Sequence, residues 1–473
     1  MKLRAQSARL NEGSAAPEIS KNMKYLPHTS DDIQQMLDVI CVKSLDDLYA
    51  EVPEELKLTR PLNLPHAMSE VEVRRELQRL ADKNKPLCIF AGAGAYDHYT
   101  PSVIPYITAR SEFSTSYTPY QAEISQGTLQ YIFEYQTLMA RLTDMDVSNA
   151  SMYDGATATA EAMMMCVAAA KKRNRVLISS TFAPNVLRVV ETYAHYHGVD
   201  LQAIPEKDGV TDKDFLKKAV EEDDVAGVLL PQPNYYGIVE DFEGIADHCH
   251  AHKTLLAINA VPADLATLRS PGEWGADIAC GDGQSLGLPL SCGGPYIGYL
   301  CCKEDLVRKM PGRLVGMTTD AEGRRAFVLT MQAREQHIRR EKATSNICTA
   351  QGIMCLWIGA YLSLMGQKGL QEAAALSYAG AHTLRDLLTA DGAFAEAFPD
   401  QPFFNEFTLK CEGVCPNQLR HAMAEKGWLA GIAAEGRKDL LILCVTEKRS
   451  REEIEAFAKE LIACKNELSA SSK

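Results

Sequence analysis

The sequence has too few basic residues for a typical nucleic-acid-binding protein. Its 473 residues include 49 Lys and Arg against 62 Asp and Glu, which gives a formal net charge of −13. Because phosphate recognition needs concentrated positive charge, this balance argues against nucleic acid and anionic membrane surfaces as partners. Hydrophobic residues make up 46% and charged residues 23%, which is the composition of an ordinary globular protein.

No two cysteines have the C-x-x-C spacing, although 14 cysteines are scattered from Cys41 to Cys464. A secreted disulfide scaffold would be shorter and more regularly spaced, so we expect free thiols in a reducing cytoplasm. The N-terminus also has no apolar signal-peptide core, and residues 1–22 are expected to form a disordered extension. Together these features predict a cytoplasmic protein.

The sequence contains one long run without charge, residues 343–366, which has the length of a transmembrane span. This run nevertheless carries several hydroxyl and amide side chains and three glycines. A helix buried inside a large α/β protein explains it better, so no membrane segment is expected.

The middle of the chain alternates between short apolar strands and amphipathic helices. Strands are expected at 86–90, 175–179, 200–205, 226–232, 254–261, 277–282 and 293–302, and helices at 157–173, 184–197, 212–222 and 241–252. Near-continuous apolar strands between such helices are typical of a mostly parallel sheet that helices cover on both faces.

The domain organisation follows from changes in this pattern. After the extension we expect an N-terminal helical segment (23–85), a large α/β domain (86–370) and a smaller C-terminal α/β domain (371–473). The N-terminal segment should hold a helix capped by Ser30, Asp31 and Asp32. The C-terminal domain is expected because two further strands and two helices follow one another in the last hundred residues.

A glycine turn, GAGAYDHYTP (92–101), follows the first expected strand. The carboxyl end of a strand is where open α/β sheets place their ligand sites. The turn lacks the third glycine of a dinucleotide fingerprint, so it is a weak nucleotide site. Tyr96 and His98 are candidate functional side chains in this loop, although simple loop packing explains them equally well.

Three further segments each allow two interpretations. YDGATATAEA (153–162) could hold a phosphate at a helix N-terminus, or it could be an ordinary helix start. His248 and His252 would share one helix face, but no H-E-x-x-H glutamate lies between them, and we expect them to end a surface helix rather than to bind metal. The basic segment 333–346 is either a solvated helical face or an anion-binding or subunit-contact element.

Three longer strings carry a resemblance to a known family: GAGAYDHYTPSVIPYITARSEFSTSYTPYQAEISQGTLQYIFEYQTL (92–138), GDGQSLGLPLSCGGPYIGYL (281–300) and REQHIRREKATSNICTAQ (334–351). They resemble the glycine dehydrogenase (decarboxylating), or P-protein, family of the glycine cleavage system. The resemblance covers essentially the whole chain from Met23 onward. It matches the N-terminal half, which is subunit 1 where the enzyme is split into two chains, and it implies the pyridoxal-phosphate fold type I.

The resemblance also implies where the cofactor groups would be. Members that carry pyridoxal phosphate need a lysine for the Schiff base and an acid that keeps the pyridinium nitrogen protonated. The place of the acid is taken by Asn259, and that of the lysine by Ser285, or by Gln284 if the register shifts by one residue. No lysine occurs between Thr254 and Cys302. We therefore expect vestigial cofactor positions here and pyridoxal phosphate on the partner, subunit 2, not covalently on this chain.

The implied enzyme is glycine dehydrogenase (aminomethyl-transferring), which decarboxylates glycine and passes the aminomethyl group to the lipoyl arm of the H-protein. The chain would act in an α₂β₂ heterotetramer with subunit 2 and would be inactive alone. We assign no catalytic residue and no metal ligand to it. Across the interface, we expect it to line the partner's active site with Tyr96, His98, Tyr117, Tyr120, Glu123, Thr344, Ser345 and Asn346.

Two alternatives remain. The chain could be a self-sufficient pyridoxal-phosphate aminotransferase or lyase, with Lys253, Lys303 or Lys342 as the nearest candidate lysines, although none is on the expected loop. It could also be a scaffold, with every active-site atom supplied by subunit 2. Visible absorbance of a bound cofactor in the isolated chain would favour the first alternative, and full activity of subunit 2 alone would favour the second.

Overall fold

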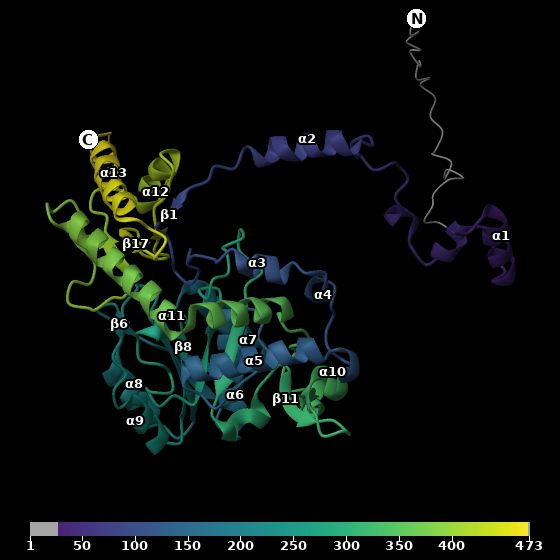
Figure 1. The fold of residues 1–473 in the computed structure, drawn as a ribbon, viewed down its shortest axis with the longest axis horizontal. Coiled ribbons are helices and arrows are strands. Elements are labelled where there is room, and N and C mark those ends of the chain that lie inside the picture. Colours follow the sequence, from purple (N-terminus) through teal and green to yellow (C-terminus); the bar gives the residue numbers. More distant parts are fainter. Residues whose placement is uncertain (1–26, 472–473) are drawn as a thin grey trace, which may run out of the picture. The chain divides into compact units, whose positions relative to one another are not determined.

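The computed structural model describes residues 27–471, which divide into two compact units at the boundary between Asn84 and Lys85. The expected extension 1–22 lies outside the described residues. Figure 1 shows the fold and labels many of the helices and strands.

The N-terminal unit contains short helices, and its described residues, 27–84, form no hydrophobic core. Its elements are α1 (Ser30–Val39), η1 (Leu45–Tyr49), η2 (Glu54–Leu56) and α2 (Glu70–Ala81). Helix α1 begins after Thr29, whose hydroxyl accepts the N–H of Asp32 while the Asp32 carboxylate accepts the N–H of Thr29. The cap is therefore Thr29, one residue before the expected Ser30. Among the described residues of this unit, Leu37 is the only buried hydrophobic side chain.

The larger unit is built on a seven-stranded sheet with the strand order β2-β10-β9-β8-β7-β3-β4. The strands are β2 (Val147–Ser148), β3 (Arg175–Ser179), β4 (Asp200–Ile204), β7 (Val225–Gln232), β8 (Leu255–Ala260), β9 (Ile278–Asp282) and β10 (Gly298–Cys302). Strand β10 is antiparallel to both neighbours, and the other four pairs are parallel. The prediction of a mostly parallel sheet is confirmed, and β2 is the strand that the apolar pattern missed.

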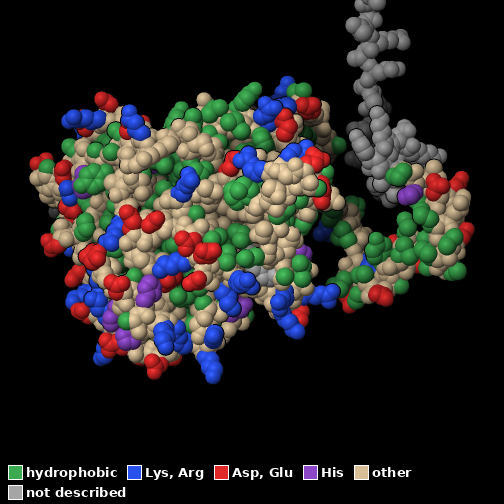
Figure 2. Space-filling view, turned by 60° about the horizontal axis from the view of Figure 1, so that its bottom comes forward, with side chains coloured by type: hydrophobic (Ala, Val, Ile, Leu, Met, Phe, Trp, Pro, Cys, Tyr) green, Lys and Arg blue, Asp and Glu red, His purple; other side chains and the backbone are tan. Residues whose placement is uncertain are grey.

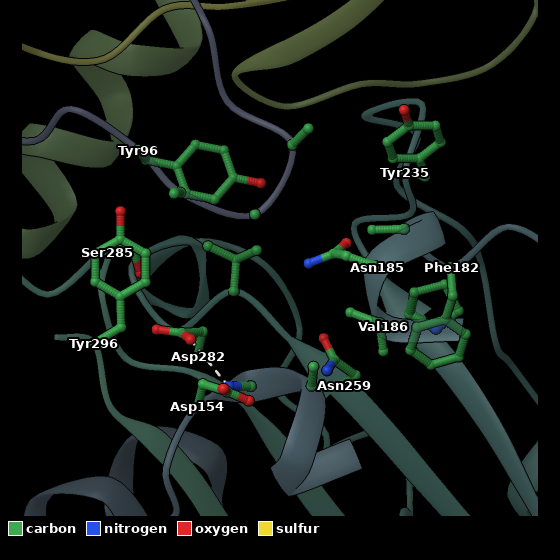
Figure 3. A pocket seen from close by; sticks show the side chains of 18 of the residues that line it. Tyr96, Asp154, Phe182, Asn185, Val186, Tyr235, Asn259, Asp282, Ser285 and Tyr296 are labelled. Carbon is green, nitrogen blue, oxygen red and sulfur yellow. Dashed lines mark hydrogen bonds between the residues drawn. The ribbon is translucent and has the colours of Figure 1, made fainter. Parts of the chain in front are cut away.

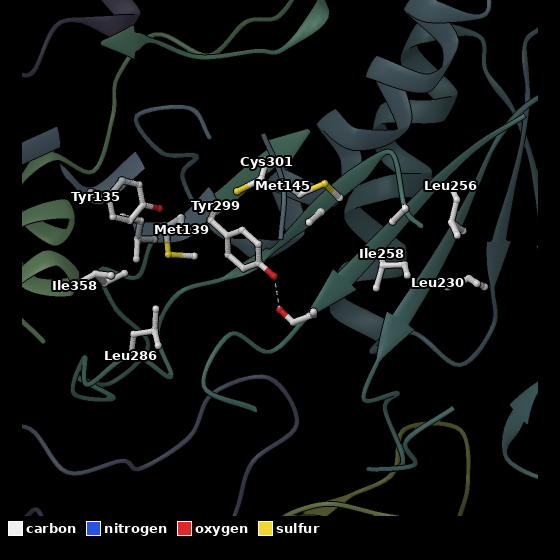
Figure 4. Packing of buried hydrophobic residues seen from close by; sticks show 14 of the residues in the cluster. Tyr135, Met139, Met145, Leu230, Leu256, Ile258, Leu286, Tyr299, Cys301 and Ile358 are labelled. Atoms are coloured by element: carbon white, nitrogen blue, oxygen red, sulfur yellow. Dashed lines mark hydrogen bonds between the residues drawn. The ribbon is translucent and has the colours of Figure 1, made fainter. Parts of the chain in front are cut away.

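Helices cover both faces of this sheet, as predicted. Alternate strand residues point to opposite faces, so that Leu256, Ile258 and Ala260 of β8 belong to one core cluster and Ala257 to the other. In the first cluster the Tyr299 hydroxyl donates to the Ala260 carbonyl at 2.7 Å (Figure 4). One face is covered by α5 (Gln126–Thr143), α8 (Lys213–Val220), α9 (Ile245–Ala251) and α11 (Gly352–Thr389), and the other by α6 (Gly155–Ala169) and α7 (Pro184–His197).

The charge-free run 343–366 is helical only from Gly352, where α11 begins. Helix α11 bends at Gly366, which has a φ of 58° and a ψ of −176°, and its first part lies beside α5 (Figure 1). Among the described residues, no helix has both the length and the apolar character needed to cross a membrane. Lys and Arg side chains alternate with Asp and Glu over the face in Figure 2, without an extended basic patch.

A second, four-stranded antiparallel sheet forms the C-terminal part, in the order β13-β14-β17-β16. Its strands are β13 (Ala395–Glu396), β14 (Glu406–Lys410), β16 (Ile432–Ala433) and β17 (Leu440–Cys444), and α12 (Pro416–Glu425), α13 (Arg451–Ser471) and the second part of α11 pack against it. Further helices are α3 (Val103–Thr108), α4 (Ser111–Ser114) and α10 (Gln336–Arg339). Further strands are β5 (Glu206–Lys207), β6 (Val210–Thr211) and the hairpin of β11 (Leu314–Thr319) and β12 (Arg325–Thr330).

The strand expected at 86–90 does not join the large sheet, so that prediction is wrong. Only β1 (Cys88–Ile89) is extended, and it pairs in parallel with β15 (Trp428–Leu429). The reason is aromatic packing: the Phe90 ring is fully buried and stacks on Phe457 of α13, with 3.9 Å between the ring centroids. Burying Phe90 in the C-terminal core holds this segment away from the large sheet.

Candidate functional site

A cavity of about 590 Å³ lies at the carboxyl ends of the parallel strands (Figure 3). The loops that follow β2, β3, β7, β8 and β9 line it, together with the loop after β1 and the side chain of Glu406 from β14. This edge is where open α/β sheets bind their ligands, and the volume is that of a small-molecule pocket. We refer to this space as the strand-end cavity.

Two carboxylates occupy the N-terminus of α6 at the floor of the cavity. Asp154 caps the helix by accepting the N–H of Thr157 at 2.8 Å, and Asp282 at the end of β9 accepts the N–H of Gly155 at 2.9 Å. Burial raises the pKa of Asp282 to about 6. Because the protein's own carboxylates take up these N–H groups, the turn is an ordinary capped helix start rather than a phosphate cradle.

Asn259 and Ser285, the two expected vestigial positions, both line the cavity. Asn259 lies in β8, and its amide donates to the Thr159 hydroxyl at 2.6 Å. Ser285 is buried, and its hydroxyl oxygen accepts the N–H of Ala263 at 3.2 Å. Figure 3 shows both side chains on the wall of the cavity.

Gln284, the alternative register, is fully buried and does not line the cavity. Its amide donates to the carbonyl of Tyr96 at 2.8 Å and to that of Leu288 at 2.7 Å, and it accepts the Tyr96 N–H at 2.7 Å. Gln284 thus holds the 92–101 loop by its backbone, and the side chain that reaches the cavity is that of Ser285.

Glu406 is a site residue that the sequence reasoning missed. It is 4% exposed, and its carboxylate accepts the N–H of Ala93 at 2.6 Å and the hydroxyl of Tyr96 at 3.3 Å. Burial, together with the nearby Asp264 carboxylate, raises the pKa of Glu406 to about 8. An acidic residue at the start of the expected strand EFTLK was the available signal, because charged side chains are rarely buried without a function or a partner.

His98 does not reach the strand-end cavity, although it lies in the same loop as Tyr96. Its Nδ1 atom is 2.6 Å from the Glu447 carboxylate, and both side chains are largely buried. It lines a separate void of about 10 Å³ together with Asp264 and Ser377. Burial raises the pKa of Asp264 to about 7, and the nearby His98 opposes this shift.

Tyr117, Tyr120 and Glu123 are exposed and lie outside the cavity lining. The Tyr120 hydroxyl accepts a hydrogen bond from the Arg313 guanidinium at 3.3 Å, and that guanidinium lies 5.2 Å from the centroid of the Tyr120 ring. The ring of Tyr117 is 6.4 Å from that of Tyr120. Tyr117 and Tyr120 therefore lie together at the surface.

Thr344, Ser345 and Asn346 also lie outside the cavity lining. The Ser345 hydroxyl donates to the buried carboxyl of Glu161 at 2.5 Å, and burial raises the pKa of that carboxyl to about 7. Asn346 is exposed, and Thr344 is half-buried. Of the expected interface residues, the structure brings only Tyr96 next to Asn259 and Ser285.

The histidines of the HCHAH run make ordinary contacts within the protein. His248 Nε2 is 2.9 Å from the carbonyl of Lys217, and His250 Nε2 is 2.9 Å from the Asp277 carboxylate. Helix α9 ends at Ala251, so the prediction that the run ends a helix is confirmed. In the part of the chain that the structure describes, no group of three or more His, Cys, Asp or Glu could hold a metal ion.

The residues of the strand-end cavity do not fit pyridoxal phosphate, the cofactor that the resemblance implies. None of the lining residues is a Lys, Arg or His, so nothing there could form the covalent bond or neutralise a phosphate. Asn259, at which the resemblance places the acid, has a neutral amide that could not hold the pyridinium charge. The alternative lysines do not line the cavity, since Lys253 and Lys342 are exposed and Lys303 pairs with Asp277 at 3.0 Å.

Comparison with protein families finds one match, which covers almost the whole described chain. The profile of the family described as glycine cleavage system P-protein matches residues 23–461. A relative from Carboxydothermus hydrogenoformans, named "Probable glycine dehydrogenase (decarboxylating) subunit 1", is 46% identical over 445 residues, which are 93% of this chain and 99% of that protein. A relative of the same name from Moorella thermoacetica is 47% identical over 440 residues, which are 92% of this chain and 98% of that protein.

Solved structures give the same result for the fold. A crystal structure of the glycine decarboxylase (P-protein) of the glycine cleavage system, in inhibitor-bound form, is 40% identical with a TM-score of 0.83, and the match covers 93% of this chain and 100% of that chain. A Burkholderia pseudomallei sphingosine-1-phosphate lyase and a Lactobacillus brevis glutamate decarboxylase share the fold, each at 14% identity and a TM-score of 0.64. The predicted pyridoxal-phosphate fold type I is confirmed.

Proposed function

Because the chain belongs to the glycine cleavage system P-protein family, we propose that it is the subunit of a two-chain glycine decarboxylase that does not hold the cofactor. The observation that carries the proposal is a strand-end cavity without a lysine, in a fold whose other members bind pyridoxal phosphate. The cofactor is then held by subunit 2, where it supplies the electron sink for the loss of CO₂ from glycine.

The role of this chain is to complete the active site of its partner from across the subunit interface. Tyr117, Tyr120, Glu123 and Asn346 suit direct contact, because their side chains are exposed in this chain. Ser345 holds its own segment in place through Glu161, and Thr344 adjoins it. The basic residues next to this segment, Arg339, Arg340 and Lys342, are exposed and could pair with anionic groups of a partner.

Tyr96 and His98 act as positioning residues in this proposal, since each is only 6% exposed. Tyr96 holds the loop through Glu406, and His98 holds it through Glu447. Their hydrogen bonds fix the path of the loop that presents the exposed Tyr99 ring to solvent. This is a role in shaping the interface, separate from contact with substrate.

The assembled enzyme is proposed to be a cytoplasmic α₂β₂ heterotetramer of this chain and subunit 2. Its substrates are glycine and the lipoylated H-protein, which receives the aminomethyl group. The proposal is supported by the names of the relatives, which call them subunit 1, and by the match, which covers 99% and 98% of these two relatives.

Reconstitution tests the division of labour between the two chains. Both chains are purified, and glycine–bicarbonate exchange in the presence of H-protein is measured with each chain omitted in turn. We expect exchange only with both chains present and visible cofactor absorbance only in subunit 2. If reduction with borohydride attaches the cofactor to a lysine of this chain, the self-sufficient enzyme is the better description. Full exchange by subunit 2 alone would instead make this chain a scaffold.

The interface residues are tested in the reconstituted enzyme with matched pairs of variants. Tyr120→Phe removes only the hydroxyl that Arg313 binds, whereas Tyr120→Ala also removes the ring. Contact with the partner's site predicts a lower exchange rate for both variants, while a purely structural role predicts that Tyr120→Phe behaves as wild type. For His98, rescue by His98→Gln, which can still donate to Glu447, together with loss in His98→Ala would support positioning.

A further inference from the structure

We propose that the strand-end cavity of this chain binds a small organic cation, a protonated amine with an uncharged aliphatic or aromatic body. The site goes beyond the decarboxylase function, because it lies on the chain that does not carry the cofactor and its own residues define the ligand. Four features support this site: the size of the cavity, the sign of its charge, a buried carboxyl group with no cation beside it and an aromatic wall.

The cavity is large enough for an organic molecule and carries charge of one sign. Its volume is about 590 Å³, within the range of ligand pockets. The ionisable acids in its lining are Asp154, Asp282 and Glu406, which come from three separate elements, and its lining contains no Lys, Arg or His. Any ligand inside therefore meets a negative potential, which favours a cation and disfavours an anion.

The Glu406 carboxyl group provides the anchor. It accepts two hydrogen bonds, from the Ala93 N–H and the Tyr96 hydroxyl, although a carboxylate has room for about four. The groups that face it from the surrounding elements are Tyr96, Asp264, Tyr235 and Cys444, and none of these is a cation. Because no cation stabilises its ionised form, the free Glu406 carboxyl group holds its proton. A ligand ammonium group would supply the missing positive charge and hydrogen-bond donor.

The remaining walls suit the body of such a ligand. The rings of Tyr153, Phe182, Tyr235 and Tyr296 line the cavity, and ring faces attract cations. Val186 adds apolar surface opposite Tyr296 in Figure 3. This combination of aromatic rings and a carboxylate fits an amine better than it fits a neutral molecule.

The same walls exclude two classes of ligand. An amino acid zwitterion has a carboxylate that would need a Lys or Arg partner, and the cavity lining supplies neither. A phosphate ester would meet the Asp154 and Asp282 carboxylates at the N-terminus of α6, and the cavity lining has no Lys or Arg that could neutralise it. The ligand is therefore a cation without an anionic group.

Three probes of similar shape and different charge test the proposal: N,N-dimethylbenzylamine, benzyl alcohol and benzoate. The tertiary amine is protonated near neutral pH and cannot form an imine with the cofactor of subunit 2. Binding is measured by isothermal titration calorimetry on the full-length chain in complex with subunit 2. We expect the amine to bind at least tenfold more tightly than the alcohol, and benzoate not to bind.

Variants of this chain assign the binding to the cavity. Glu406→Gln keeps the size of the side chain and removes the charge, so it should weaken amine binding at least tenfold. Tyr296→Leu, in a half-buried position, should weaken binding of the amine more than binding of the alcohol and serves if Glu406→Gln folds poorly. The control is Glu372→Gln, which removes an exposed carboxylate of α11 that pairs with Lys368, and it should leave binding unchanged.

Proton release gives a second readout. Burial and Asp264 raise the pKa of Glu406 to about 8, so near pH 7 the free carboxyl is mostly protonated and must lose its proton to pair with an ammonium group. Binding enthalpies in buffers of different ionisation enthalpy should show proton release in the wild type and none in Glu406→Gln. Equal affinity for the three probes, undiminished binding to both variants, or no amine binding at millimolar concentration would each overturn the proposal.

Discussion

At the residue scale, the main feature of the larger unit is a set of buried carboxyl groups that hold their protons at unusually high pH. Burial raises the pKa of Glu406 to about 8, of Asp264 and Glu161 to about 7, and of Asp282 to about 6. Asp264 lies near Glu406, and its negative charge adds to the raised pKa of Glu406 because like charges disfavour ionisation. These groups make the stability of the fold sensitive to pH.

Glu406→Gln is expected to change how stability depends on pH. The folded-state pKa of Glu406, about 8, is above its usual value of 4.5. The folded state therefore binds the proton more tightly, and the wild type loses stability as the pH rises between these two values. The free energy of unfolding of the variant, relative to wild type, should increase over that range by up to about 1.4 kcal/mol per pH unit.

Urea unfolding at acidic and at mildly alkaline pH measures this difference. The exposed Glu372→Gln variant is the control and should differ from wild type by the same small amount at both pH values. A Glu406→Gln difference that is constant with pH would show that Glu406 ionises normally in the folded protein.

Gly155→Ala is expected to destabilise the larger unit through a steric clash. A Cβ atom at this position would lie 2.7 Å from the backbone nitrogen of Asp282, so that α6 or β9 would have to shift. We expect a loss of about 1–3 kcal/mol in the free energy of unfolding. In the matched variant Gly127→Ala, the added methyl group meets nothing within 4 Å. That variant should be neutral or slightly stabilising, and a similar loss in both would refute the clash.

At the element scale, helix α11 is the longest helix of the described chain, and its bend has a local cause. Gly366 has a backbone conformation that is essentially restricted to glycine, with a φ of 58° and a ψ of −176°. The bend separates the part of α11 that covers the large sheet from the part that packs on the C-terminal sheet. The two helical parts of α11, joined at Gly366, thus contribute to two cores.

Gly366→Ala should cost about 1–3 kcal/mol in the free energy of unfolding, because alanine strains the backbone at the bend. Gly359→Ala, in the same helix, lies in open space and should add up to about 1 kcal/mol through its better helix propensity. Thermal unfolding of the two full-length variants compares them directly. Equal effects of the same sign would mean that the bend is not maintained by Gly366.

At the scale of the whole molecule, the N-terminal unit differs from the rest of the chain. Its described residues expose many large apolar side chains, among them Leu58 at 60%, Leu62 at 62% and Leu64 at 70%. Exposed apolar surface of this extent is typical of a segment that a partner covers. We therefore expect the unit to contribute to binding of subunit 2.

The combined variant Leu58→Glu, Leu62→Glu, Leu64→Glu should weaken the complex with subunit 2 by at least tenfold, since charged side chains would have to be buried on binding. The unfolding of the isolated chain should change little, because these residues belong to none of its hydrophobic clusters. Calorimetric titration with subunit 2 measures the affinity, and urea unfolding of the isolated chain measures its stability. Unchanged affinity would place the subunit interface elsewhere.

The sequence by itself determined the large sheet, the helices on both of its faces and the absence of a lysine near Asn259 and Ser285. These features are local in the sequence. Burial on one or both faces of an element sets the spacing of its apolar residues, and the absence of lysine from a segment can be read directly from the sequence. The succession of expected strands along the chain and the family strings together predicted that Asn259 and Ser285 lie near the ends of successive strands.

Only the tertiary structure decided which side chains share the cavity. Glu406 accepts the N–H of Ala93 across 313 residues of chain, and no periodicity encodes such a pairing. Long-range contacts also separate Tyr96 from His98, because Tyr96 bonds to Gln284 and His98 to Glu447. They likewise hold β1 at the C-terminal core. Contacts between distant segments depend on packing in three dimensions, which is why the negative charge of the cavity became visible only in the folded chain.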